Sequence, residues 1–185
     1  MVRLFVAVDT KDYNLKKYVI QIQELIRSWG LKATYPDPDQ LHITLKFIGE
    51  VDESLVPKII SSLSQIRSKP ITLKFDGVGG FPSLNRPRVI YVNVEDNPEI
   101  QYLQANVERS LAFLNRRDNK AFHPHVTVAR IKTPYRWTPR YSSELEKLEL
   151  SLELKIDYFV LKKSTLTSSG PIYTDVKVFK LIENS

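Results

Sequence analysis

Two short stretches of the sequence place a threonine two residues after a histidine: His42-Ile43-Thr44 and His125-Val126-Thr127. Both lie in runs that alternate between polar and apolar residues, which is the pattern of a β-strand with one buried face. In such a strand the histidine and the threonine share the polar face, about 6–7 Å apart. The chain has three histidines, and two of them occupy equivalent places in these motifs.

A pair of histidines facing each other across a cleft is suited to acid–base catalysis, because near neutral pH one imidazole can accept a proton while the other donates one. Displacement at phosphorus also needs positive charge and hydrogen-bond donors around the non-bridging oxygens. Thr44 and Thr127 would supply hydroxyl groups. Lys46, which the alternation places on the same face as His42 and Thr44, or Arg130 would supply charge. Arg130 is out of phase with His125 in a regular strand, so its role requires a bend or a strand end.

Other chemistries have less support. His123 and His125 alternate along a strand and could bind zinc with His42 as a third ligand. However, the chain has no cysteine, and no acidic residue stands near them at a ligand-like spacing. We therefore expect no metal. A single His-x-Thr motif would most often be structural, and only the presence of two favours catalysis. No Gly-x-Ser-x-Gly elbow and no Walker loop occur, so a serine hydrolase and an ATP-dependent ligase are not supported.

The hydrophobic periodicity predicts an α+β protein. Strands are expected at 3–8, 31–35, 42–49, 71–78, 89–94, 122–131, 150–156, 158–163 and 172–181. Helices are expected at 15–29, 55–66, 97–114 and 143–148, and irregular segments at 79–87, 133–140 and 164–171.

The order strand, helix, His-x-Thr strand occurs twice, from Arg3 to Phe47 and from Arg88 to Arg130. The opening strand and the motif histidine are 39 residues apart in the first case (3 to 42) and 37 in the second (88 to 125). This agreement predicts an internal duplication. Packing the two units about an approximate two-fold axis would bring both His-Thr faces to one shared cleft.

The composition, 42% hydrophobic and 26% charged, is that of an ordinary globular protein. The apolar runs are too short to span a membrane, and the opening residues carry charge too early for a signal peptide. We therefore expect a cytoplasmic protein that does not bind membranes.

The net charge of +6 is concentrated beside the second motif. Between residues 115 and 140 the only acidic residue is Asp118, and the basic residues are Arg116, Arg117, Lys120, Arg130, Lys132, Arg136 and Arg140. Such a cluster is often just a solvated basic face. Its place beside a catalytic histidine instead favours an anionic partner such as RNA.

Together these stretches resemble the two-histidine (2H) phosphoesterases, and within them the RNA 2',3'-cyclic phosphodiesterases, also called 2'-5' RNA ligases (LigT-like). The resemblance covers most of the chain. It includes residues 3–9, 42–51, 87–92 and 124–130, and a tail at 164–173 that is similar to the family's Ser-x-Leu-Thr-Pro-x-Gly-Pro-x-Tyr. Ser168 stands where the family often has proline, which affects loop stiffness rather than chemistry.

The resemblance implies a bilobal α+β fold in which residues 1–185 form a single domain. It is a pseudo-two-fold duplicated unit with antiparallel sheets flanking a central cleft and helices on the outside. The implied activity is metal-independent opening of a 2',3'-cyclic phosphate at an RNA end to a 2'-phosphomonoester, without a cofactor. Some relatives also join or cleave 2'-5' linked RNA.

By the same resemblance His42 would be the proton donor and His125 the proton acceptor. Thr44 and Thr127 would hold the phosphate, and Arg130 with the neighbouring basic loop would hold the RNA backbone. We expect the enzyme to be a monomer. Three aromatic residues are candidates for stacking on a base: Phe47, Tyr135 and Trp137. Two alternatives remain open, namely a module that binds RNA ends with little catalysis and a phosphodiesterase for a small cyclic phosphate.

Overall fold

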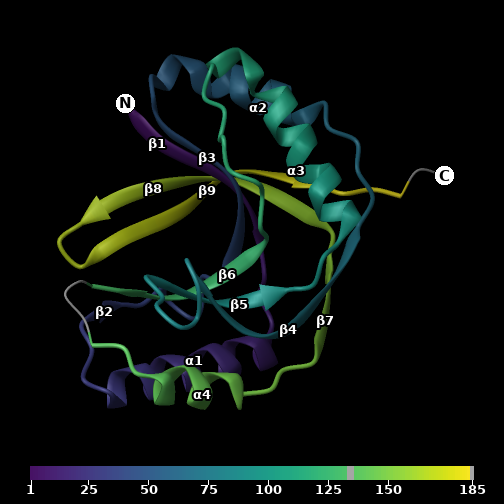
Figure 1. Ribbon diagram of the computed structural model, residues 1–185. Helices are drawn as coiled ribbons and strands as arrows, with labels where there is room; N and C mark the ends of the chain where they lie inside the picture. The colour runs from purple at the N-terminus through teal and green to yellow at the C-terminus, as the bar shows by residue number, and fades with distance from the viewer. Residues whose placement is uncertain (133–135, 184–185) are drawn as a thin grey trace.

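The computed structural model describes residues 1–132 and 136–183 and consists of two antiparallel sheets with helices on their outer faces (Figure 1). The first sheet has the strand order β3-β1-β8-β9: His42–Val51, Val2–Asp9, Tyr158–Thr167 and Gly170–Lys180. The second has the order β2-β6-β5-β4-β7: Ala33–Thr34, His125–Ile131, Val89–Val94, Ile71–Phe81 and Leu152–Ile156. The expected α+β class is confirmed.

Two of the helices are exchanged between the two halves of the chain. Helices α1 (Tyr13–Ser28) and α4 (Pro139–Glu146) pack on the second sheet, while α2 (Val56–Ser64) and α3 (Pro98–Ser110) pack on the first (Figure 1). Two short 3-10 turns, Glu53–Leu55 and Ala112–Leu114, complete the helical elements that the structure describes. Because α1 follows β1 and α3 follows β5, each of these two helices covers the sheet of the other half.

The two long helices begin at capping residues. The Asp12 carboxylate accepts a hydrogen bond from the backbone N–H of Leu15 at 2.9 Å. The Asn97 side chain accepts from Glu99 and Ile100, and Pro98 follows at a position where its missing N–H costs nothing. Both helices bury an apolar stripe, so the helical periodicity in the sequence is confirmed.

One continuous cluster of buried side chains joins the two sheets. It includes Val6 and Ile43 from the first sheet and Ile90 and Val126 from the second, all with no exposed surface. This shared core supports the expectation of a single bilobal unit. None of the helices within residues 1–132 and 136–183 is both long and apolar enough to cross a membrane.

The duplication predicted from the sequence is visible in the strand pairing. β1 pairs with β3 as β5 pairs with β6, both antiparallel. Asp9 lies opposite His42 in the first pair, and Asn93 lies opposite His125 in the second. The two histidines are therefore structurally equivalent.

A β-bulge follows each His-x-Thr motif at the equivalent place. Leu45 in β3 and Val128 in β6 have no partner of their own on the neighbouring strand. The extra residue reverses the alternation, so Phe47 and Arg130 return to the face of the histidines. The bend that Arg130 requires is thus present. The expectation that Lys46 shares the histidine face is wrong, because the bulge turns it away.

Several boundaries differ from the sequence predictions. β4 continues to Phe81, through Gly79, where a Cβ atom would lie 2.6 Å from the ring of Tyr91. β6 begins at His125 rather than at residue 122, and α4 spans 139–146 rather than 143–148. Residues 164–171 are not a loop but the end of a tight β8–β9 hairpin whose turn is at 168–169. This hairpin end is largely exposed, so no alternation marked it as strand.

Lys46 instead joins the first sheet to α3. The residue is only 4% exposed. Its ammonium group donates to both carboxylate oxygens of Glu108 at 3.0 Å and to the carbonyl of Arg116. The Arg116 guanidinium donates back to the carbonyls of Ile48 and Glu50 on β3. These bonds hold the start of the 115–124 segment, which leads to the second motif, against the strand of the first motif.

We expect Lys46→Met to lower the free energy of unfolding by about 1–3 kcal/mol, because Glu108 loses its partner while keeping partial access to water. The matched control is Lys74→Met, which removes a strand lysine from an exposed 3.6 Å ion pair with Glu153. That change should cost less than about 1 kcal/mol. Urea denaturation followed by tryptophan fluorescence measures both. Equal losses in the two variants would contradict the role given to Lys46.

Candidate active site

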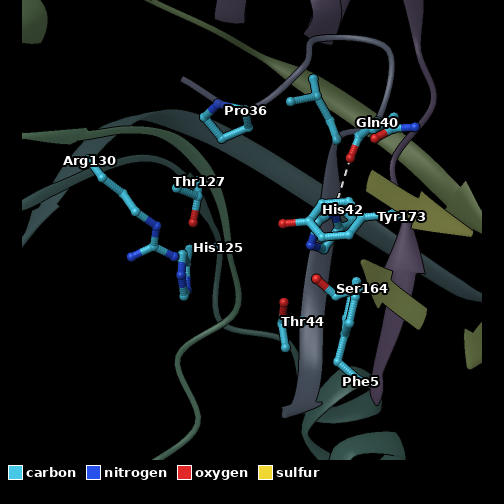
Figure 2. Close-up of a pocket in the computed structure, with 11 residues that line it drawn as sticks. Phe5, Pro36, Gln40, His42, Thr44, His125, Thr127, Arg130, Ser164 and Tyr173 are labelled. Carbon is cyan, nitrogen blue, oxygen red and sulfur yellow. Dashed lines mark hydrogen bonds between the residues drawn. The ribbon is translucent and has the colours of Figure 1, made fainter. Parts of the chain in front are cut away.

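The two His-x-Thr motifs face each other across a small cavity of about 130 Å³ (Figure 2). His42 and Thr44 line it from β3, and His125, Thr127 and Arg130 line it from β6. The structure therefore brings together the two predicted histidines, both threonines and Arg130, whereas Lys46 does not line this cavity. Phe5, Pro36, Gln40, Leu41, Ser164 and Tyr173 complete the lining.

Both histidines are held in the same tautomer by the backbone. Nδ1 of His42 lies 2.9 Å from the carbonyl oxygen of Gln40, and Nδ1 of His125 lies 2.6 Å from that of His123. A carbonyl oxygen can only accept a hydrogen bond, so Nδ1 carries the proton in each ring. In the neutral ring Nε2 is then the basic nitrogen, available to accept or, once protonated, to donate a proton.

Aromatic side chains fix the plane of each imidazole. The His42 ring lies 5.4 Å from the ring centroids of both Phe5 and Tyr173. In the other half, His125 lies 4.9 Å from Phe81 and 5.2 Å from Tyr91. The two histidines are thus positioned by similar means, but the aromatic rings come from non-equivalent positions of the two halves.

Burial lowers the pKa of both His42 and His125 from the ordinary imidazole value, because the cavity solvates the charged ring poorly. The neighbouring charges differ. At His125, the positive charges of His123, Arg130 and His42 lower the pKa further. At His42, Lys162 lowers the pKa and the Asp9 carboxylate raises it. Only His42 has a carboxylate among the charges that act on it.

The Asp9 carboxylate is itself part of a partly buried network. It lies 2.9 Å from the Lys162 ammonium group and accepts a hydrogen bond from the Tyr158 hydroxyl at 2.9 Å. Lys162 also pairs with Asp175 at 2.8 Å. The corresponding residue beside His125, Asn93, is uncharged and donates to Asp76. The environments of the two histidines are therefore electrostatically unequal.

A second, larger cavity of about 640 Å³ continues from the first and shares Thr44, His125 and Arg130 with it. Its walls combine apolar rings with basic and polar groups. Besides the shared residues, the aromatic and basic residues of the lining are Lys46, Phe47, Phe81, Arg88, Lys120, Phe122 and His123, and Asp118 is its acidic residue. Such a space accommodates a group much larger than a phosphate.

The aromatic candidates for base stacking separate clearly. Phe47 is 55% exposed and lines the larger cavity. Trp137 packs against Trp29 and Tyr141, and its indole N–H donates to Ser142, so its role is structural. Tyr135 lies outside the described residues.

Some site residues were missed from the sequence. Gln40 acts on His42 through its backbone carbonyl, which no side-chain pattern reveals. Tyr173 lies in the tail that carries the family resemblance, but nothing in its own spacing pointed to His42. Within the described ranges no group of three or more His, Cys, Asp or Glu side chains could hold a metal ion.

The fold and the paired His-x-Thr strands define the class of protein, a two-histidine phosphoesterase. The profile of the 2'-5' RNA ligase superfamily matches residues 15–165, and the chain belongs to this family.

Individual relatives cover nearly the whole chain. The RNA 2',3'-cyclic phosphodiesterase of Archaeoglobus fulgidus is 39% identical over 180 residues, which are 96% of this chain and 99% of that protein. The protein of the same name from Methanothermobacter thermautotrophicus is 33% identical, with 97% and 99% covered. A crystal structure of a Thermus thermophilus protein superimposes with a TM-score of 0.78 at 29% identity, covering 97% of each chain.

The burial of the two imidazoles predicts that His42 and His125 both titrate below the ordinary value of about 6.5. Burial penalises the protonated form, so each ring releases its proton at lower pH. Long-range ¹H–¹⁵N spectra recorded across a pH series measure both pKa values and also report the tautomer, with Nε2 unprotonated in the neutral ring. A pKa at or above 6.5 for either histidine in the free protein would contradict this account.

Proposed function

We propose that the protein is a metal-independent RNA 2',3'-cyclic phosphodiesterase that produces 2'-phosphomonoester ends. One observation carries the proposal: two imidazoles, each with Nδ1 tied to a carbonyl, line one phosphate-sized cavity together with two threonines and an arginine. The names of the relatives that match the chain from end to end supply the substrate class.

In the proposed reaction Nε2 of His125 takes a proton from a water molecule as its oxygen attacks phosphorus. The bond from phosphorus to the ribose 3' oxygen breaks on the opposite side, and that oxygen receives a proton from Nε2 of His42. The phosphate stays on the 2' oxygen. The hydroxyls of Thr44 and Thr127 donate to the non-bridging oxygens, and Arg130 neutralises their charge. Return of a proton from solvent to His42, and loss of one from His125, completes the cycle.

The unequal charges around the two rings support this division of roles. All the charges acting on His125 oppose its protonation, which suits a base. Asp9 favours the protonated form of His42, which suits an acid, although Lys162 acts in the opposite direction. A bound phosphate dianion or monoanion favours the protonated ring at both positions.

The larger cavity supports an RNA substrate over a small cyclic phosphate. A nucleoside attached to the cyclic phosphate would extend past Thr44 and His125 into this space, where Phe47 offers an exposed ring for stacking. Lys120 and Arg88 line the same cavity and suit the neighbouring phosphates. We also propose that the enzyme is monomeric and cytoplasmic. The same site could join two RNA ends through a 2'-5' linkage, as the reverse of cleavage of that linkage by transesterification.

Replacing either histidine should nearly abolish hydrolysis. We expect His42→Ala and His125→Ala each to lower kcat by roughly 10²–10⁴, the usual contribution of a general acid or base. The assay is phosphorus NMR of an oligonucleotide ending in a 2',3'-cyclic phosphate. EDTA should leave the wild-type rate unchanged. Substantial turnover by either variant would defeat the mechanism, and RNA binding without product by the wild type would favour a binding module.

Arg130→Met should weaken binding of the phosphate more than it slows the chemistry. Loss of one charge-assisted hydrogen bond predicts a roughly 10- to 100-fold rise in KM and in the inhibition constant of inorganic phosphate. The matched control is Arg67→Met, which removes an arginine that lines a separate cavity near α3. Should both variants bind phosphate equally well, Arg130 is not the anion ligand.

A further inference from the structure

Gln23 is a polar residue on the otherwise apolar buried face of α1. It is 2% exposed and lies between the fully buried Ile22 and Ile26. Its amide nitrogen donates to the carbonyl of Val128 at 3.1 Å and to the carbonyl of Pro36 at 3.0 Å. Moving an amide from water into an apolar environment without hydrogen-bond partners costs on the order of several kcal/mol. Both bonds are therefore needed for Gln23 to occupy this position.

The two carbonyls belong to the two walls of the phosphate cavity. Val128 is the bulge residue of β6, and the bulge is what returns Arg130 to the histidine face. Pro36 lines the cavity and begins the segment that ends at Gln40, whose carbonyl fixes Nδ1 of His42. One buried amide thus joins the segment that orients the first histidine to the bulge that orients the arginine.

The other half of the molecule repeats this arrangement. Gln104 of α3 donates from its amide nitrogen to the carbonyl of Leu45, the bulge residue of β3, at 3.4 Å. Since α1 and α3 each cover the sheet of the other half, each glutamine reaches the bulge of the opposite motif. A helix glutamine therefore meets the bulge carbonyl in both halves, although Gln104 is only half-buried and makes one such bond where Gln23 makes two.

We propose that Gln23 is a positioning residue for the substrate phosphate, because it holds the β6 bulge and the 36–40 segment together and so sets the place of Arg130 relative to His42. The inference rests on the proposed function in one respect, that Arg130 binds the phosphate. Gln23 itself contacts no substrate. Its effect passes through the carbonyls of Val128 and Pro36.

The test is binding of inorganic phosphate, followed by chemical-shift titration of the His42 and His125 side chains. Gln23→Met keeps the length and burial of the side chain but removes the amide. We expect it to weaken phosphate binding on the order of tenfold or more, since a small displacement of a ligand group has large effects on a preorganised site. Gln21→Met, the same change at an exposed position of the same helix, should bind phosphate as the wild type does.

A double variant separates positioning from general destabilisation. If Gln23 acts through Arg130, Gln23→Met combined with Arg130→Met should bind phosphate no more weakly than Arg130→Met alone. The inference would be overturned if the losses of phosphate affinity in the two single variants multiplied in the double variant. It would also be overturned if Gln23→Met bound phosphate as tightly as the wild type. If Gln23→Met fails to fold, Gln23→Asn replaces it, since its shorter amide cannot reach both carbonyls. A wild type that binds no phosphate would refute the proposed function instead.

Discussion

The site depends on one constraint, that a backbone carbonyl freed by a β-bulge and covered by a helix must find a donor away from water. The bulges at Leu45 and Val128 are what give each His-x-Thr strand a third residue on the reactive face. Gln104 and Gln23 satisfy the freed carbonyls. Because each glutamine comes from the helix of the other half, neither half can build its reactive strand alone. The two lobes are coupled at the same points that form the site.

An approximate two-fold axis makes the two histidines geometrically equivalent, yet acid and base must differ. The difference comes from one position inside the repeated unit, which holds Asp9 in one copy and Asn93 in the other, and from Lys162, which lies outside it. Asp9 with its Lys162 partner lies on the His42 side, and the uncharged Asn93 lies on the other. The two strands also differ in the residue that the bulge returns to the histidine face, which is Phe47 in β3 and Arg130 in β6. One wall of the cleft therefore offers an aromatic ring and the other a positive charge, as a nucleoside phosphate requires.

The sequence alone predicted what depends on periodicity: the opening strand, the helices expected at 15–29 and 97–114, and the two reactive strands with their duplication. It could not predict the bulges, because strict alternation assigns Lys46 to the face of His42 and removes Arg130 from that of His125. Only tertiary packing reverses both. The β8–β9 hairpin end was also hidden, since its exposed residues show no alternation, and so the packing of Tyr173 against His42 was not foreseen. The sequence also could not show that Trp137 packs against Trp29 and Tyr141 and so is not available to stack on a base.

The lowered pKa values also bear on how the proposed enzyme is primed. Burial favours the neutral form of both rings, so both act more readily as bases than as acids before an anion enters. A phosphodiester anion entering between them stabilises the protonated form, and the Asp9 carboxylate favours placing that proton on His42 rather than on His125, where every neighbouring charge opposes it. The substrate thus helps to create the proton donor that its own leaving oxygen needs. In the proposed reaction the acid thus develops through close confinement of one anion between two rings whose orientation the backbone has already fixed.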